Sequence, residues 1–155
     1  MEKILFLHGL ETRVDKVKKR FLEKNGFNVI FPKLPKSSFE ESIKLAQELI
    51  DKESPEVILA SDRGGAVALC LNLNPEDLIL VAPTWKNYNL SKDKDFPSRC
   101  MIIFSKQDAE VDPNEVYKSM KNNLVNWINV GVDHQMNDKD SLEAILDAVK
   151  WVLRH

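Results

Sequence analysis

The sequence predicts an α/β fold: a three-layer, doubly wound parallel sheet of about six strands. Two observations predict it. Short apolar runs rich in β-branched residues alternate with longer segments whose apolar residues recur at helical spacing. The short runs are apolar throughout, which is typical of strands with helices packed on both faces. Right-handed crossovers between such strands give a doubly wound sheet.

Six runs share the strand character: Ile4–Leu7, Asn28–Phe31, Val57–Ala60, Leu78–Val81, Cys100–Phe104 and Trp127–Val130. Five segments have helical periodicity: Val14–Lys24, Phe39–Lys52, Gly64–Leu73, Pro113–Asn122 and Ser141–Leu153. The last has the clearest amphipathic pattern, with apolar residues at i, i+3, i+4 and i+7 from Leu142. Ser37 or Ser38 should begin the second helix, and Asp140 or Ser141 the last.

Composition predicts one globular domain over residues 1–155. The chain is 43% hydrophobic, and its 22 basic residues nearly balance 24 acidic ones. Since no basic block occurs, we expect neither a nucleic-acid partner nor an anionic membrane surface. The apolar run near the N-terminus stops at Leu7, and no stretch approaches the ~20 apolar residues of a membrane span. Charge and length leave the oligomeric state open.

The two cysteines favour a reducing, cytoplasmic location. Cys70 and Cys100 lie in apolar runs with no C-x-x-C spacing and no flanking histidine. We therefore expect buried free thiols and no zinc site. Neither a metal nor another cofactor is expected.

Reactive side chains follow four of the predicted strands. His8 comes directly after the first, Asp62 closely after the third, Asp108 after the fifth and His134 after the sixth. Ligands of open parallel sheets bind outside the carboxyl ends of the strands. The sequence therefore predicts a site at this edge.

The run at 60–65 resembles the nucleophile elbow of the α/β hydrolases, usually written G-x-S-x-G. That tight turn requires small residues two positions before and two after the nucleophile. Ala60 and Gly64 meet the requirement when Asp62 takes the nucleophile position. With Ser61 there, a leucine and an arginine would clash. The chain thus resembles a short, capless member of this superfamily, a minimal α/β-hydrolase fold with Asp62 in place of the usual serine.

The resemblance implies roles for the other strand ends. Asp108 would be the acid and His134 the base of an Asp-His-Asp constellation. The turn after the first strand would supply an oxyanion-hole N–H from Leu10, with a second from Arg63. Asp133 competes with Asp108 as the partner of the histidine.

A long connection between Val81 and Cys100 interrupts the alternation of strands and helices. It fits either a surface crossover or a lid. As a lid, it would contribute Trp85 and Tyr88 to a substrate pocket that also includes His8. His8 is equally compatible with a structural role.

An aspartate in the nucleophile position favours attack on an alkyl carbon. It is ionised at neutral pH and needs no base before attack. Attack on an ester carbonyl would give a mixed anhydride, whereas attack on an alkyl carbon gives an ester that water can cleave. This is the chemistry of the haloalkane and haloacetate dehalogenases and epoxide hydrolases, and the Asp-Arg-Gly at 62–64 resembles the haloacetate type.

We therefore expect a small-molecule hydrolase in which Asp62 attacks and His134 activates water. The alternative is a catalytically weak or inactive hydrolase-fold protein that acts as a binding module. A flavodoxin-like or response-regulator domain fits less well, because no acidic cluster follows the first strand and no phosphate loop is evident.

Overall fold

A computed structural model describes residues 1–73, 78–84, 100–112, 114 and 126–154. Its sheet has six parallel strands in the order β2-β1-β3-β4-β5-β6. The strands are β1 (Lys3–Leu7), β2 (Asn28–Ile30), β3 (Val57–Ser61), β4 (Leu78–Val81), β5 (Met101–Phe104) and β6 (Asn126–Asn129). The described helices are α1 (Thr12–Lys24), α2 (Phe39–Glu53), α3 (Arg63–Ala68) and α5 (Lys139–Arg154). The predicted fold class is confirmed.

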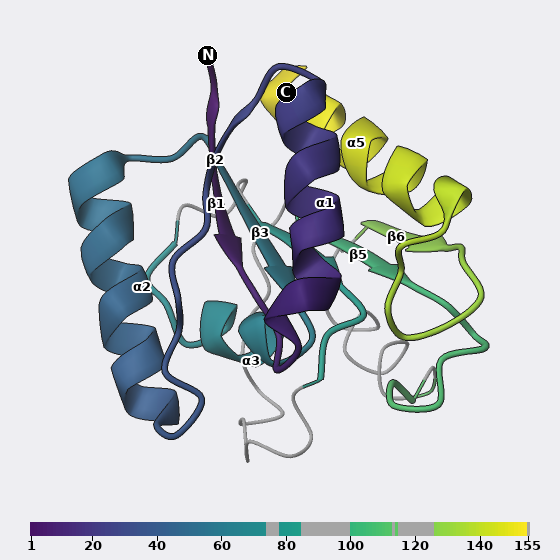
Figure 1. The fold of residues 1–155 in the computed structure, drawn as a ribbon, viewed down its shortest axis with the longest axis horizontal. Coiled ribbons are helices and arrows are strands. Elements are labelled where there is room, and N and C mark those ends of the chain that lie inside the picture. The colour runs from purple at the N-terminus through teal and green to yellow at the C-terminus, as the bar shows by residue number, and fades with distance from the viewer. Residues whose placement is uncertain (74–77, 85–99, 113, 115–125, 155) are drawn as a thin grey trace.

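The helices form two layers around the sheet. Helices α1 and α5 lie on one face, and α2 and α3 lie on the other (Figure 1). Successive strands run outward in one direction from β1 to β2 and in the other from β3 to β6. The winding therefore reverses between β1 and β3, and a site is expected at their carboxyl ends.

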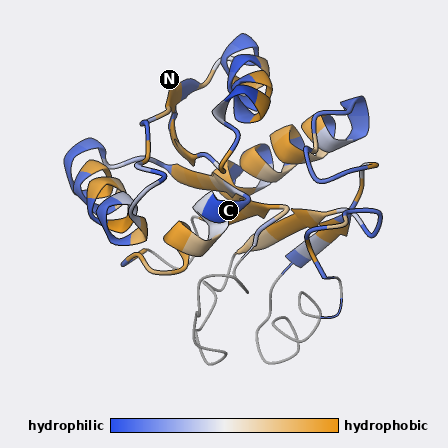
Figure 2. Cartoon of the chain, turned by 60° about the horizontal axis from the view of Figure 1, so that its bottom comes forward, coloured by the Kyte–Doolittle hydropathy of each residue, from blue (hydrophilic) through white to orange (hydrophobic). Residues whose placement is uncertain are grey.

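Burial explains why the central strands are apolar throughout. Every residue of β3 and β4 is buried, as are four of the five residues of β1. Apolar residues concentrate in the strands and on the inward sides of the helices, while hydrophilic residues cover the outer helix surfaces (Figure 2). Such a core is the main stabilising contribution to a domain of this size. None of the helices in the described ranges is long and apolar enough to cross a membrane.

Two predicted details need correction. Helix α3 ends at Ala68 rather than Leu73, because the chain tightens into turns in which the Leu71 N–H donates to the Ala68 carbonyl. The cap of α5 is Asp138, whose carboxylate accepts the Ser141 N–H at 3.2 Å. The prediction of Ser38 as the cap of α2 is confirmed. The predicted helix at 113–122 lies almost wholly outside the described residues.

Candidate functional site

Asp62 occupies a sharp turn between β3 and α3. Its backbone has φ 54° and ψ −122°, a combination that a non-glycine residue rarely adopts. The turn also needs glycine at two contacts. A Cβ on Gly64 would overlap the Leu7 carbonyl oxygen, and one on Gly9 would lie 2.6 Å from the Asp62 Cβ. The small residues predicted around Asp62 therefore have a steric cause: β1 and its following loop pack directly against the turn.

Donors surround the Asp62 carboxylate. The Leu10 backbone N–H donates to Oδ2 at 3.2 Å, and the Thr84 hydroxyl donates to Oδ1 at 3.0 Å. The Arg63 backbone N–H also contacts this carboxylate. Burial by itself would raise the pKa of Asp62, but these hydrogen bonds and His134 outweigh it and lower the pKa to about 2. Asp62 is therefore a carboxylate at neutral pH.

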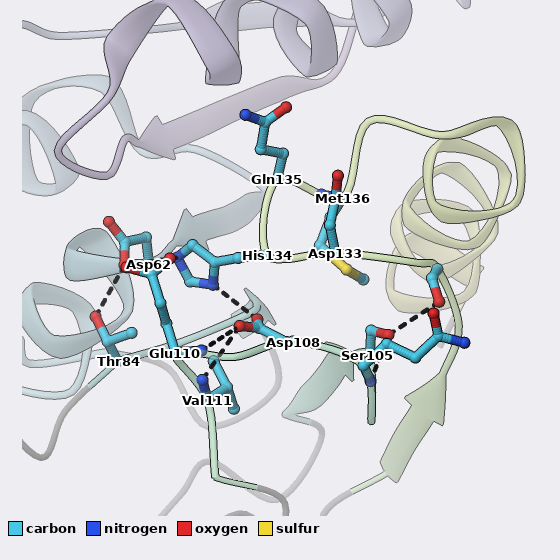
Figure 3. A network of polar contacts seen from close by, with 12 residues as sticks. Asp62, Thr84, Ser105, Asp108, Glu110, Val111, Asp133, His134, Gln135 and Met136 are labelled. Carbon is cyan, nitrogen blue, oxygen red and sulfur yellow. Dashed lines mark hydrogen bonds and ion pairs between the residues drawn. The ribbon is translucent and has the colours of Figure 1, made fainter.

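His134 lies between two carboxylates, as Figure 3 shows. Its Nδ1 is 2.7 Å from Asp108 Oδ2, and its Nε2 is 3.0 Å from Asp62 Oδ1. Burial disfavours the charged ring, yet the hydrogen bonds and charges of both aspartates prevail and raise the pKa of His134 to about 10. Glu110 Oε2 is 3.2 Å from Nε2, but its side chain is 64% exposed, so solvent screens its charge.

Asp108 is oriented by its own loop. Its Oδ1 accepts the N–H groups of Glu110 at 2.7 Å and Val111 at 3.2 Å, which leaves Oδ2 for His134. Asp133, the competing candidate, instead accepts the Met136 N–H within the histidine loop. The geometry therefore pairs His134 with Asp108.

Comparison with known proteins gives structural likeness only: neither a family model nor a curated protein matches this sequence. A solved structure described as a hydrolase of the α/β superfamily, from Xanthomonas campestris pv. campestris, superposes with a TM-score of 0.74 at 16% identity over 99% of both chains.

The chain has the α/β-hydrolase fold. Two further structures share it. An α/β serine hydrolase without a lid, also from Xanthomonas campestris, has 18% identity and a TM-score of 0.68 over 98% of this chain and 80% of its own. The esterase domain of a Rhodothermus marinus protein has 12% identity and a TM-score of 0.72 over 99% of this chain and 87% of its own.

The remaining predicted residues of this hydrolase-fold site divide into three groups. His8 is 1% exposed; its Nε2 accepts the Leu34 N–H at 2.9 Å, so Nδ1 carries the proton that is donated to the Gly9 carbonyl oxygen. The Arg63 guanidinium turns inward, with Nη1 3.2 Å from the Ser42 hydroxyl. Trp85 and Tyr88 lie outside the described residues, so their pocket role stays a prediction.

Sequence reasoning missed two residues that contact the site, Thr84 and Glu110. Thr84 follows β4 at the same sheet edge as Asp62. Its place after a strand could have identified it as a candidate site residue. Glu110 approaches the imidazole only because the loop after β5 turns back on Asp108. No motif or residue spacing in the sequence predicts that this loop brings Glu110 to the imidazole.

One group of ligand atoms could approach a cation. Single atoms of Asp108, Glu110 and His134 lie within 4.8 Å of one another. The imidazole, however, already lies between two carboxylates, and its raised pKa keeps both ring nitrogens protonated at neutral pH. A metal would therefore have to displace one of these protons. We assign no metal-ligand role to these residues.

The raised pKa of His134 predicts a pH dependence of stability. Between pH 6.5 and about 10, the folded protein retains a proton on this ring that the unfolded chain has lost. The free energy of unfolding should therefore fall as pH rises through this window. Urea unfolding of wild type and His134→Gln at several pH values measures it, because the difference between the two curves isolates this ring. Parallel curves would contradict the ion pairing.

Proposed function

We propose that the protein is a small-molecule hydrolase that cleaves a bond at an alkyl carbon, with Asp62 as the nucleophile. One observation carries the proposal: the two carboxylate oxygens of Asp62 face different partners. Oδ2 lies on the Leu10 N–H, while Oδ1 faces His134. A nucleophile that forms an ester needs this division, with one oxygen for attack and the other in an oxyanion hole.

In the first step, Asp62 Oδ1 attacks the alkyl carbon as the leaving group departs with its bonding electrons. The leaving group is a halide or the oxygen of a strained epoxide. The product is an alkyl ester whose carbonyl oxygen is Oδ2. Because this attack needs no proton transfer from the nucleophile, the low pKa of Asp62 suits it.

The second step uses His134. Esterification removes the charge of Asp62, so one of the two carboxylates that stabilise the imidazolium is lost and the pKa of His134 falls. The Nε2 proton then passes to the alkoxide of an opened epoxide or, where a halide has departed, to solvent. The neutral Nε2 takes a proton from water, and the hydroxide attacks the Asp62 carbonyl carbon. The backbone N–H groups of Leu10 and Arg63 stabilise the charge that forms on Oδ2. Collapse releases the alcohol, which takes its proton from His134.

Trapping the ester tests this proposal. His134→Gln removes the base but leaves Asp62 free to attack, so the alkyl-enzyme should accumulate rather than turn over. Incubation with a panel of small alkyl halides and epoxides should raise the protein mass by one alkyl group for a halide, or by the mass of the whole epoxide. Peptide mass spectrometry should locate that group on Asp62.

The double variant Asp62→Asn/His134→Gln is the matched control, and it should stay unmodified. Modification at a cysteine or at Glu110 instead would count against Asp62. If a folded His134→Gln protein reacts with no member of the panel, the binding-module alternative becomes the better account.

A further inference from the structure

A buried lysine lies behind the site, on α1. The side chain of Lys18 is 0% exposed, although lysine is almost never fully buried unless it is paired. Its ammonium carries three N–H donors, and three acceptors lie within hydrogen-bond distance of it. These are Asp15 Oδ1 at 3.2 Å, the Gln135 carbonyl oxygen at 2.6 Å and Asn137 Oδ1 at 2.8 Å. Every hydrogen-bonding group of the ammonium is thus satisfied.

These contacts connect α1 to both loops that form the site. On one side, Asp15 Oδ2 accepts the Gly9 N–H at 2.7 Å, and the next residue, Leu10, donates to Asp62. On the other side, Gln135 directly follows His134 in the chain. Asn137 adds a return contact, because its amide donates to the Val14 carbonyl oxygen at 2.9 Å.

We propose that Lys18 is a positioning residue: the Asp15–Lys18 pair holds the histidine loop and the loop of the Leu10 N–H in one register, which places His134 Nε2 against Asp62. A buried ion pair contributes little net stability by comparison with apolar residues of similar volume, so we attribute to this pair a role in specifying geometry rather than in stability. The two groups it joins, Gly9 and Gln135, are 126 residues apart in the chain, and each adjoins a residue that contacts Asp62.

Electrostatics separates positioning from a direct charge effect. Removing a positive charge near an imidazole favours the protonated ring, so the direct effect of Lys18→Met on the pKa of His134 is upward or absent. Loss of positioning acts in the opposite direction, because His134 would move away from the two carboxylates that raise its pKa. The sign of the change therefore identifies the cause.

NMR titration of the His134 ring in Lys18→Met is the test, and it needs no substrate. We expect the pKa to fall from about 10 toward the ordinary value of 6.5. Leu22→Ala is the matched control, because Leu22 is a buried apolar residue one turn further along α1 whose side chain cannot hydrogen-bond to either loop. It should lower stability and leave the pKa high. If Lys18→Met does not fold, Asp15→Asn/Lys18→Met leaves no unpaired carboxylate and keeps an acceptor for the Gly9 N–H.

An unchanged or higher pKa in the folded Lys18 variant would overturn the inference. Its kinetic part rests on the proposed function: with His134 intact, Lys18→Met should slow release of the alkyl group from Asp62, the step in which His134 acts, and leave formation of the ester nearly unchanged. The experiments can reject the proposed function and the positioning role of Lys18 independently of each other. Absence of any ester rejects the proposed function alone, and a His134 pKa that stays at about 10 in the variant rejects the positioning role alone.

Discussion

Asp62→Ser is expected to turn the protein into a hydrolase of small activated esters. The serine hydroxyl would stand on the same turn, within the same loops. With one carboxylate gone, the pKa of His134 should fall, so its Nε2 becomes available as a base near neutral pH. The N–H groups of Leu10 and Arg63, no longer engaged by a carboxylate, become free for the oxyanion of the substrate.

The expected gain is large. A positioned base contributes roughly 10²–10⁴-fold and a single oxyanion donor roughly 10²–10³-fold, so even a partly aligned site should exceed the wild type by about 10³-fold. Initial rates on a p-nitrophenyl ester of a short acid measure it. The wild type should be poor on this ester, because attack by a carboxylate would give a mixed anhydride.

Two comparisons make the gain interpretable. Asp62→Ser/His134→Ala should return to the background rate, which ties the activity to the imidazole. Asp62→Ala, with neither nucleophile, should remain at background. A folded Asp62→Ser protein no faster than these controls would mean that the loops around residue 62 are not preorganised for chemistry.

Much of this fold could be predicted because its signals are local. Apolar runs such as Val57–Ala60 are typical of strands that are buried on both faces in a covered parallel sheet, and the observed β3 extends this run by one residue. The register at Asp62 was predictable for a steric reason. A side chain at position 64 would overlap the carbonyl oxygen of Leu7, and glycine records that close approach in the sequence.

The predictable part of the site depended on order along the strand ends. The resemblance to the α/β hydrolases predicted the pairing of Asp108 with His134, and both residues follow strands whose carboxyl ends share one edge of the sheet. The choice against Asp133 needed coordinates, since it depends on which carboxylate its own loop engages. The burial of Lys18 could likewise not be predicted from the sequence. A lysine at helical spacing is usually a solvated residue, and only the packing of the histidine loop on α1 buries it.

A single turnover in heavy-oxygen water tests the role of Asp62 most directly. Enzyme in molar excess is mixed with the alkyl halide or epoxide that forms the trapped ester, and both the product alcohol and the Asp62 peptide are analysed by mass spectrometry. Water that attacks the carbonyl carbon of the ester leaves its oxygen in the protein, so Asp62 should gain the heavy isotope and the alcohol should carry ordinary oxygen from Oδ1. Heavy oxygen in the alcohol, with none in the Asp62 peptide, would mean direct attack of water on the substrate and would contradict a nucleophilic Asp62.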